Sequence, residues 1–115
     1  MKKKLNERAF VSELVKIFRQ HDCFVHKVAE RFASGFPDLI IINPHGKVLF
    51  VEVKVGKNKL SPLQEHFLSK IQEHRGNAYV ITKPAAGQME VLEYDGLMMT
   101  YTLEEWLQKC VGVKG

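Results

Sequence analysis

Two acidic residues and one lysine stand at a spacing that could build a chemical site. Asp38 follows a proline, and Glu52 comes fourteen positions later, two residues before Lys54. Alternate side chains of a strand point to the same face, so Glu52 and Lys54 share one face. If Asp38 opens one arm of a hairpin and Glu52 closes the other, their carboxylates meet near one end of a sheet.

Two carboxylates at close range repel each other unless a positive charge lies between them. A hard divalent cation, Mg²⁺ or Mn²⁺, would be held there by oxygen ligands and water. Lys54 could orient or help to deprotonate a water molecule, or stabilise charge on a phosphate. These are the parts that phosphodiester hydrolysis requires. The alternative is a hairpin with a solvated Glu52 and Lys54, and an Asp38 placed by turn preference. The strongly apolar strands beside these charges weaken that alternative, because an unpaired buried charge is costly.

Hydrophobic periodicity predicts the elements that would position this group. Phe10, Leu14 and Ile17 recur at helical spacing, with Asn6 as a possible cap. Apolar runs then predict three strands, the second of which is typical of a strand covered on both faces. Turn chemistry at 43–46 joins the second and third strands as a hairpin. The predicted ranges are a helix over 6–20 and strands over 23–28, 38–42 and 47–54.

A capping box, Ser61-Pro62-Leu63-Gln64, predicts the start of a second helix, and Gly76 is predicted to end it. A strand over 78–82 follows, with another possible over 89–94. A second capping box, Thr102-Leu103-Glu104-Glu105, opens a short helix in what reads as a small appendix to the fold. The order of elements predicts a sheet with helices packed on its faces.

Two further polar residues fall on the buried faces of the predicted helices. At about 100° per residue, Glu7 lies close to the centre of the apolar stripe of the first helix, whereas Glu13 faces water. Glu7 is either a helix-end residue that reaches solvent or an inward metal ligand. Gln64 lies on the buried side of the second helix, where it serves as a cap, as a site residue, or as both in different states.

Composition limits the classes of protein that need be considered. The 115 residues suit one domain over 1–115, and no apolar run has the ~20 residues of a membrane span or the pattern of a secretory signal. Cys23 and Cys110 are far apart, which favours a reducing cytosol. The net charge of +4 favours polyanionic partners. Four basic residues are candidates for a phosphate-binding face, although each could equally be a solvated surface residue: Lys27, Arg31, Lys57 and Lys59.

The order Gly35-Phe36-Pro37-Asp38, Glu52-Val53-Lys54 and Leu60-Ser61-Pro62-Leu63-Gln64 resembles the VRR-NUC (virus-type replication-repair nuclease) domain. That family belongs to the PD-(D/E)XK nuclease superfamily. The resemblance spans roughly Glu7 to Thr82. It implies an α/β fold with a restriction-endonuclease-like αβββαβ core, in which helices flank a central mixed sheet.

The resemblance also implies an endonuclease that depends on Mg²⁺ or Mn²⁺, uses no organic cofactor and cuts structured DNA. Asp38 and Glu52 are then expected as metal ligands, with the Val53 carbonyl as a third. Lys54 is expected as the catalytic lysine. Glu7 would be the first-helix acid and a less certain ligand, and Gln64 the family's helix glutamine.

Stand-alone members of the family are typically viral or bacterial homodimers associated with four-way DNA junctions. The resemblance therefore implies a homodimeric junction resolvase that acts in the cytoplasm of the host cell, without a membrane. A candidate for the dimer interface is the segment 89–100, with Leu97, Met98 and Met99, which could equally be core residues. Two alternatives remain: a nuclease for flap, nicked or linear DNA, and a catalytically silent nucleic-acid-binding module of the same fold.

Overall fold

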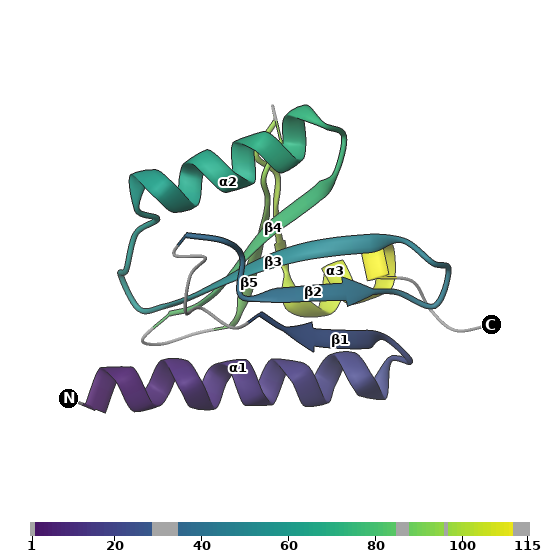
Figure 1. The fold of residues 1–115 in the computed structure, drawn as a ribbon. Coiled ribbons are helices and arrows are strands. Elements are labelled where there is room, and N and C mark those ends of the chain that lie inside the picture. The colour runs from purple at the N-terminus through teal and green to yellow at the C-terminus, as the bar shows by residue number, and fades with distance from the viewer. Residues whose placement is uncertain (1, 29–34, 85–87, 96, 112–115) are drawn as a thin grey trace.

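The computed structural model describes the backbone of residues 2–28, 35–84, 88–95 and 97–111, and the side chains within 7–109 of those ranges. Its strands form a mixed sheet of order β1-β2-β3-β4-β5-β6, in which only the β3–β4 pair is parallel (Figure 1). The elements in chain order are α1 (Lys2–Gln20), β1 (Phe24–Lys27), β2 (Leu39–Ile42), β3 (Val48–Val55), α2 (Pro62–Glu73), β4 (Asn77–Lys83), β5 (Glu90–Glu93), β6 (Thr100–Thr102), α3 (Leu103–Trp106) and a π-helical turn (Leu107–Val111).

The predicted αβββαβ core is confirmed by the order α1, β1, β2, β3, α2, β4. The start of α1 and the role of the segment after β4 differ from prediction. The helix α1 begins at Lys2, so Asn6 lies inside the helix and is not its cap. Lysine is a good helix former and no breaker interrupts residues 2–5, so the helix begins before Asn6. The segment after β4 is not an appendix, because β5 and β6 continue the same sheet.

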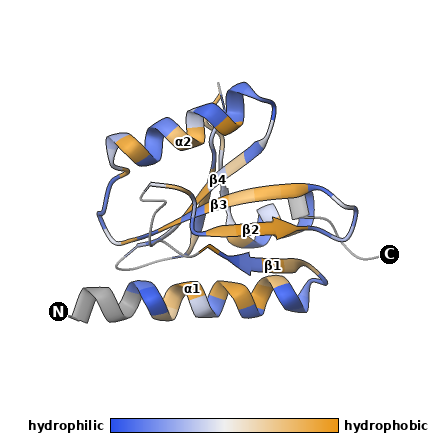
Figure 2. Ribbon diagram, in the orientation of Figure 1, coloured by the Kyte–Doolittle hydropathy of each residue, from blue (hydrophilic) through white to orange (hydrophobic). Residues whose placement is uncertain are grey.

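Helices cover both faces of the sheet (Figure 1). The larger core lies between α1 and one face and includes Phe10, Leu14 and Phe18. Trp106 from α3 enters this core, with its ring centroid 5.6 Å from that of Phe18 and 4.9 Å from that of Tyr79. A smaller core beneath α2 contains Leu68, Ala78 and Val80. Hydrophobic residues run along β2 and β3 and alternate with hydrophilic ones along α1 (Figure 2).

The prediction that the second strand is covered on both faces is wrong. Leu39 and Ile41 are fully buried, but Ile42 is 36% exposed. Ile42 pairs with Phe24 on one side and Val48 on the other, and both of these are exposed too. The reason is the placement of α2, whose main strand contact is with β4, so that this end of the face stays uncovered.

Both termini of α2 show how local chemistry fixes the helix. The predicted capping box is present, with Ser61 as N-cap and Pro62 at the first position. At the other end Arg75, not Gly76, adopts the positive φ of 64°. Arg75 N–H donates to Gln72 O and Gly76 N–H donates to Ile71 O, which is the Schellman pattern. Gly76 is required for space, because a Cβ there would lie 2.6 Å from Ile71 Cγ2.

Two turns set the position of Asp38. In the β2–β3 turn, Asn43 Oδ1 accepts from the backbone N–H groups of His45 and Lys47, each at 2.9 Å. Before Asp38, Gly35 has φ +95°, and a Cβ there would lie 2.6 Å from Leu63 Cγ on α2. The turn that leads into Asp38 therefore packs directly on the first turn of α2.

The structure describes one of the two cysteines and every helix in the described ranges. Cys23 is a free, buried cysteine. Burial raises the pKa of its thiol, and the Asp22 carboxylate raises that pKa further. The side chain of Cys110 lies outside the described residues. None of the helices in the described ranges is long and apolar enough to cross a bilayer.

We expect Gly35→Ala to destabilise the protein more than Gly46→Ala. Both glycines have positive φ, so an alanine at either costs roughly 1–2 kcal/mol in backbone strain. Only Gly35 has a neighbour within 4 Å, which adds about 1–3 kcal/mol of overpacking. Urea unfolding measures the difference. Equal losses would show that the turn does not pack on α2, whereas adding Leu63→Ala should recover stability only for Gly35→Ala.

Candidate active site

The hairpin places the two predicted acidic residues opposite each other. The β2–β3 register pairs Leu39 with Val51 and Ile42 with Val48. Continuing it by one residue sets Asp38 opposite Glu52, with both side chains on one face. Directly opposed residues of antiparallel strands have Cα atoms only ~4.5–5.5 Å apart. The register therefore places the two acidic residues beside each other on one face, which is the arrangement that the predicted site requires.

Asp38 is held where β2 begins. Its Oδ2 accepts a hydrogen bond from the backbone N–H of Val53 at 2.8 Å. In an antiparallel ladder the N–H and C=O of one residue point to the same neighbouring strand. The Val53 carbonyl therefore points toward the same side of β3 as the bond to Asp38, which is the direction that its predicted role as a ligand requires.

Glu52 is the most deeply buried charged residue among the described residues, with 2% exposure. Its Oε2 accepts a hydrogen bond from Gln64 Nε2 at 2.8 Å. The Lys54 ammonium lies 3.9 Å from the same oxygen, and its side chain is 14% exposed. A buried carboxylate is tolerated only when donors and a positive charge compensate its lost hydration, and both are present here.

Gln64 combines the two roles that the sequence left as alternatives. Its Oε1 accepts from Ser61 N–H at 2.8 Å, and its own N–H donates to Ser61 Oγ at 3.1 Å. The same side chain donates from Nε2 to Glu52. The cap and the contact with the site exist together, because each uses a different end of the amide.

The donor set suits a hard divalent cation. Asp38 is half-buried and Glu52 buried, so their mutual repulsion is poorly screened. Among the described residues no group of three or more Asp, Glu, His or Cys side chains could hold a metal. An ion between Asp38 and Glu52 would thus complete its shell with a backbone carbonyl and water, as Mg²⁺ commonly does.

Glu7 lies on a different element from the residues of this group. Its side chain is half-buried on α1, which packs on the face of the sheet opposite α2. Glu13 is exposed, as predicted, and its Oε1 lies 3.5 Å from Lys83 Nζ. The predicted role of Glu7 stays a prediction.

Three of the four predicted phosphate-binding residues are described and all three are exposed. Lys27 ends β1, and Lys57 and Lys59 lie on the loop between β3 and α2. That loop leaves β3 after Val55, the residue that follows Lys54. Arg31 lies outside the described residues.

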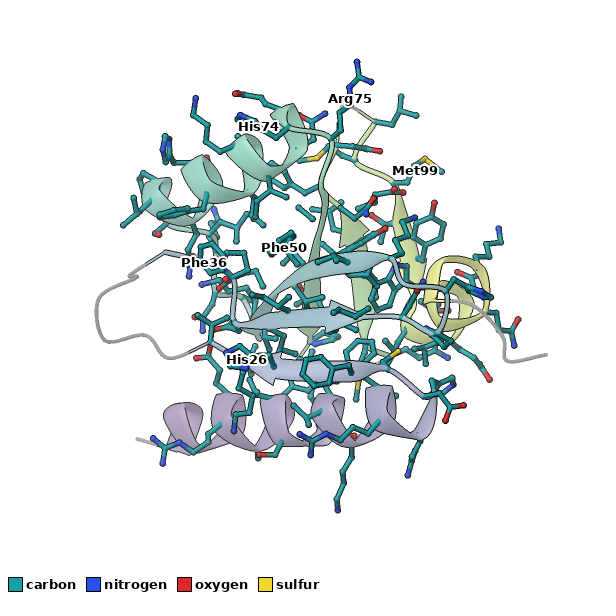
Figure 3. All side chains as sticks on the ribbon, turned by 45° about the vertical axis from the view of Figure 1, so that its right-hand side comes forward. His26, Phe36, Phe50, His74, Arg75 and Met99 are labelled. Atoms are coloured by element: carbon teal, nitrogen blue, oxygen red, sulfur yellow. The ribbon has the colours of Figure 1, made fainter. Side chains whose placement is uncertain are left out.

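Phe36 is a site-supporting residue that the sequence reasoning passed over. Its ring packs edge-on against Phe50 of β3, at 6.1 Å between centroids, and Phe67 of α2, at 5.6 Å. Figure 3 shows Phe36 beside Phe50 in the space between α2 and the sheet. The available signal was an aromatic residue just before Pro37-Asp38, since aromatic side chains bury large areas and favour edge-to-face pairs of this kind.

Comparison with known proteins places the chain in a family. In sequence, the VRR-NUC domain matches residues 3–83. A solved structure described as a VRR_NUC domain has 28% identity and a TM-score of 0.60, covering 68% of this chain and 84% of its own.

A second solved structure is Hjc, a Holliday junction resolvase from the archaeal hyperthermophile Archaeoglobus fulgidus. It has 22% identity and a TM-score of 0.55, and the match covers 71% of this chain and 74% of that one. It is similar to this chain in fold. Comparison with curated proteins gave no match. Because the family match spans well over half of the sequence and includes Asp38, Glu52, Lys54 and Gln64, the chain belongs to the VRR-NUC nuclease domain family.

Proposed function

We propose that this protein is an endodeoxyribonuclease dependent on Mg²⁺ or Mn²⁺ that cuts branched DNA, with the four-way junction as its main substrate. The observation that carries the proposal is the Asp38–Glu52 pair across β2 and β3, with the Lys54 ammonium 3.9 Å from Glu52. Membership of a nuclease family supports the reaction class. The fold likeness to a protein described as a Holliday junction resolvase supports the choice of substrate.

Asp38, Glu52 and the Val53 carbonyl would hold the cation. When bound, a divalent cation supplies Lewis acidity, which makes water easier to deprotonate and offsets charge at the phosphate. The protein's own part is to fix the ligands in advance. The Val53 N–H orients Asp38, and Gln64 orients Glu52. Preorganised ligands of this kind lower the cost of arranging charges during the reaction.

Lys54 is the catalytic residue that assists proton transfer from the attacking water and stabilises negative charge on the phosphate. Hydrolysis forms one bond from a water oxygen to phosphorus and breaks one phosphorus–oxygen bond of the backbone. The water loses a proton, and the leaving hydroxyl gains one. The ammonium of Lys54 can hydrogen-bond the attacking water or the phosphate oxygens from its place beside Glu52.

The exposed lysines would bind the DNA backbone on either side of the cut. Lys57 and Lys59 follow Lys54 on the loop into α2, and Lys27 lies at the end of β1 next to the start of β2. Phosphate contacts from lysine release counterions and position the duplex without reading its sequence. Specificity for a DNA shape, rather than for bases, is consistent with such a set.

We propose that two copies act together, with residues 1–115 as one nuclease domain in each. A junction contains two symmetric strands, and a two-fold dimer presents two sites in matching orientation. Leu97, Met98 and Met99, which the sequence left open between core and interface, are all exposed, at 79%, 44% and 48%. They are candidates for the contact between copies.

Mn²⁺ should raise the melting temperature of the wild-type protein. Binding at one hundred times Kd stabilises a folded state by about 2.7 kcal/mol. Asp38→Asn should lose most of this effect because the ion loses a charged ligand. Glu13→Gln is the matched control, since Glu13 is an exposed glutamate paired with Lys83. A metal response in Asp38→Asn as large as that of the wild type would contradict the assignment of the site.

The wild-type protein should cleave a labelled four-way junction in Mg²⁺ or Mn²⁺, and Asp38→Asn should not. Lys54→Met should slow single-turnover cleavage by roughly 10²- to 10⁴-fold, the usual contribution of a proton-transfer group. Lys70→Met, at an exposed lysine paired with Glu73, should cleave normally. Matched linear, nicked and flap substrates run beside the junction test the substrate. Faster cleavage of any of them than of the junction would refute the junction as main substrate.

In sedimentation equilibrium the protein should have twice the mass of one chain at micromolar concentration. The physical reason is the two-fold geometry that paired cuts in a junction require. A monomer both free and bound to a junction would contradict the dimer while leaving the nuclease activity untouched.

A further inference from the structure

The side-chain amide of Gln64 is oriented by the backbone of the helix cap. Its Oε1 accepts from Ser61 N–H at 2.8 Å, while its Nε2 donates to Glu52 Oε2 at 2.8 Å. A backbone N–H can only donate, so oxygen must face Ser61. The nitrogen then faces Glu52, and an ionised carboxylate can only accept. The polarity of the amide is thus fixed at both ends.

We propose that Ser61, through its backbone N–H, is a positioning residue for Glu52 and hence for the metal site. Ser61 is exposed and hydrogen-bonds to Gln64, and Gln64 in turn hydrogen-bonds to Glu52, so Ser61 acts on Glu52 through Gln64. The inference rests on the proposed function, because it concerns how tightly Glu52 is arranged to hold a cation.

The burial of Glu52 makes this control effective. With 2% exposure, its carboxylate has little access to water that could replace a lost donor. Reversing the amide would turn its oxygen toward the carboxylate and its NH₂ toward the Ser61 N–H. Both contacts would then be repulsive. The reversed orientation is therefore disfavoured as long as the Ser61 N–H is present.

Glu52 contacts residues on both sides of the loop that joins β3 to α2. The segment 56–61 leaves β3 after Lys54 and Val55 and enters α2 at the Ser61 cap. Lys54 lies beside Glu52 at the start of this segment, and Gln64 lies beside Glu52 just after its end. The same segment carries Lys57 and Lys59. A change at the Ser61 cap reaches the Glu52 carboxylate through the Gln64 side chain alone, which is a short path.

Two substitutions at one position separate the backbone contribution from that of the side chain. Ser61→Ala removes the hydroxyl that accepts from Gln64 N–H but keeps the backbone N–H that orients the amide. Ser61→Pro removes both groups. Proline fits the observed φ of −76°, and the ψ of 161° is already that of a residue before proline, because Pro62 follows.

The test is the affinity for Mn²⁺, measured by isothermal titration calorimetry without DNA. Ser61→Pro should bind about tenfold more weakly than wild type, the lower end of the effect of outer-shell partners. Ser61→Ala should stay within about twofold of wild type, because its N–H persists. Gln64→Met should bind at least as weakly as Ser61→Pro.

The control for general loss of a helix cap is Thr102→Ala. Thr102 and Glu105 form a capping box of the same kind at α3, and Trp106 beside it packs in the other core. Thr102→Ala should lower the melting temperature as Ser61→Ala does, yet bind Mn²⁺ with wild-type affinity. Weaker binding by Thr102→Ala would overturn the proposal, because cap loss anywhere would then suffice.

Wild-type affinity in a folded Ser61→Pro, or equal weakening by Ser61→Ala and Ser61→Pro, would also overturn it. If Ser61→Pro does not fold, the Mn²⁺ affinities of Gln64→Met and Thr102→Ala are compared instead. An undiminished affinity in Gln64→Met would overturn the proposal, because it would show that the hydrogen bond from Gln64 to Glu52 does not affect metal binding. Failure of the proposed function looks different. In that case wild type and every variant bind no Mn²⁺.

Discussion

Two acidic residues on one face of the β2–β3 hairpin are the constraint around which this molecule is built. Asp38 and Glu52 fall opposite each other because a short, hydrogen-bonded turn sets the β2–β3 register. Each carboxylate then accepts a hydrogen bond, Asp38 from the Val53 N–H and Glu52 from the Gln64 amide. Lys54 adds a positive charge beside Glu52. Without these groups a carboxylate as deeply buried as Glu52 would be costly to retain.

The layers of the fold follow from the same requirement. Glu52 and Lys54 use one face of β3, and Gln64 reaches them because α2 packs on that face. The other face carries the larger core with α1 and Trp106, which supplies most of the apolar burial. Stability and chemistry are thus separated across the sheet. Phe36 joins the two strands of the site to α2, so the turn before Asp38 and the helix that carries Gln64 share one anchor.

The family match and the extra strands divide the chain into two parts. Residues 3–83 match the VRR-NUC domain and contain every residue of the candidate site. The later strands β5 and β6 widen the sheet beyond β4, and α3 closes the larger core through Trp106. The site is therefore built by the shared part, and the later part contributes support at the far edge of the sheet. The exposed Leu97–Met99 loop belongs to this later part.

The sequence by itself determined the features that depend on neighbours a few residues apart. Both capping boxes, the hairpin turn and the Glu52–Lys54 face are local, and local hydrogen bonds follow from residue type and spacing. From them the opposition of Asp38 and Glu52 could be predicted. The family resemblance supplied the remaining expectations about the site.

Only the tertiary structure decided what depends on packing between distant segments. It placed α2 over β4 and so left Ile42 exposed, although an apolar run had indicated a strand covered on both faces. It required Gly76 for the space beside Ile71 while Arg75 took the positive φ. It also let one amide of Gln64 serve the cap and Glu52 together. A sequence specifies which groups can bond, but the distance between a helix and a strand is set by the whole core.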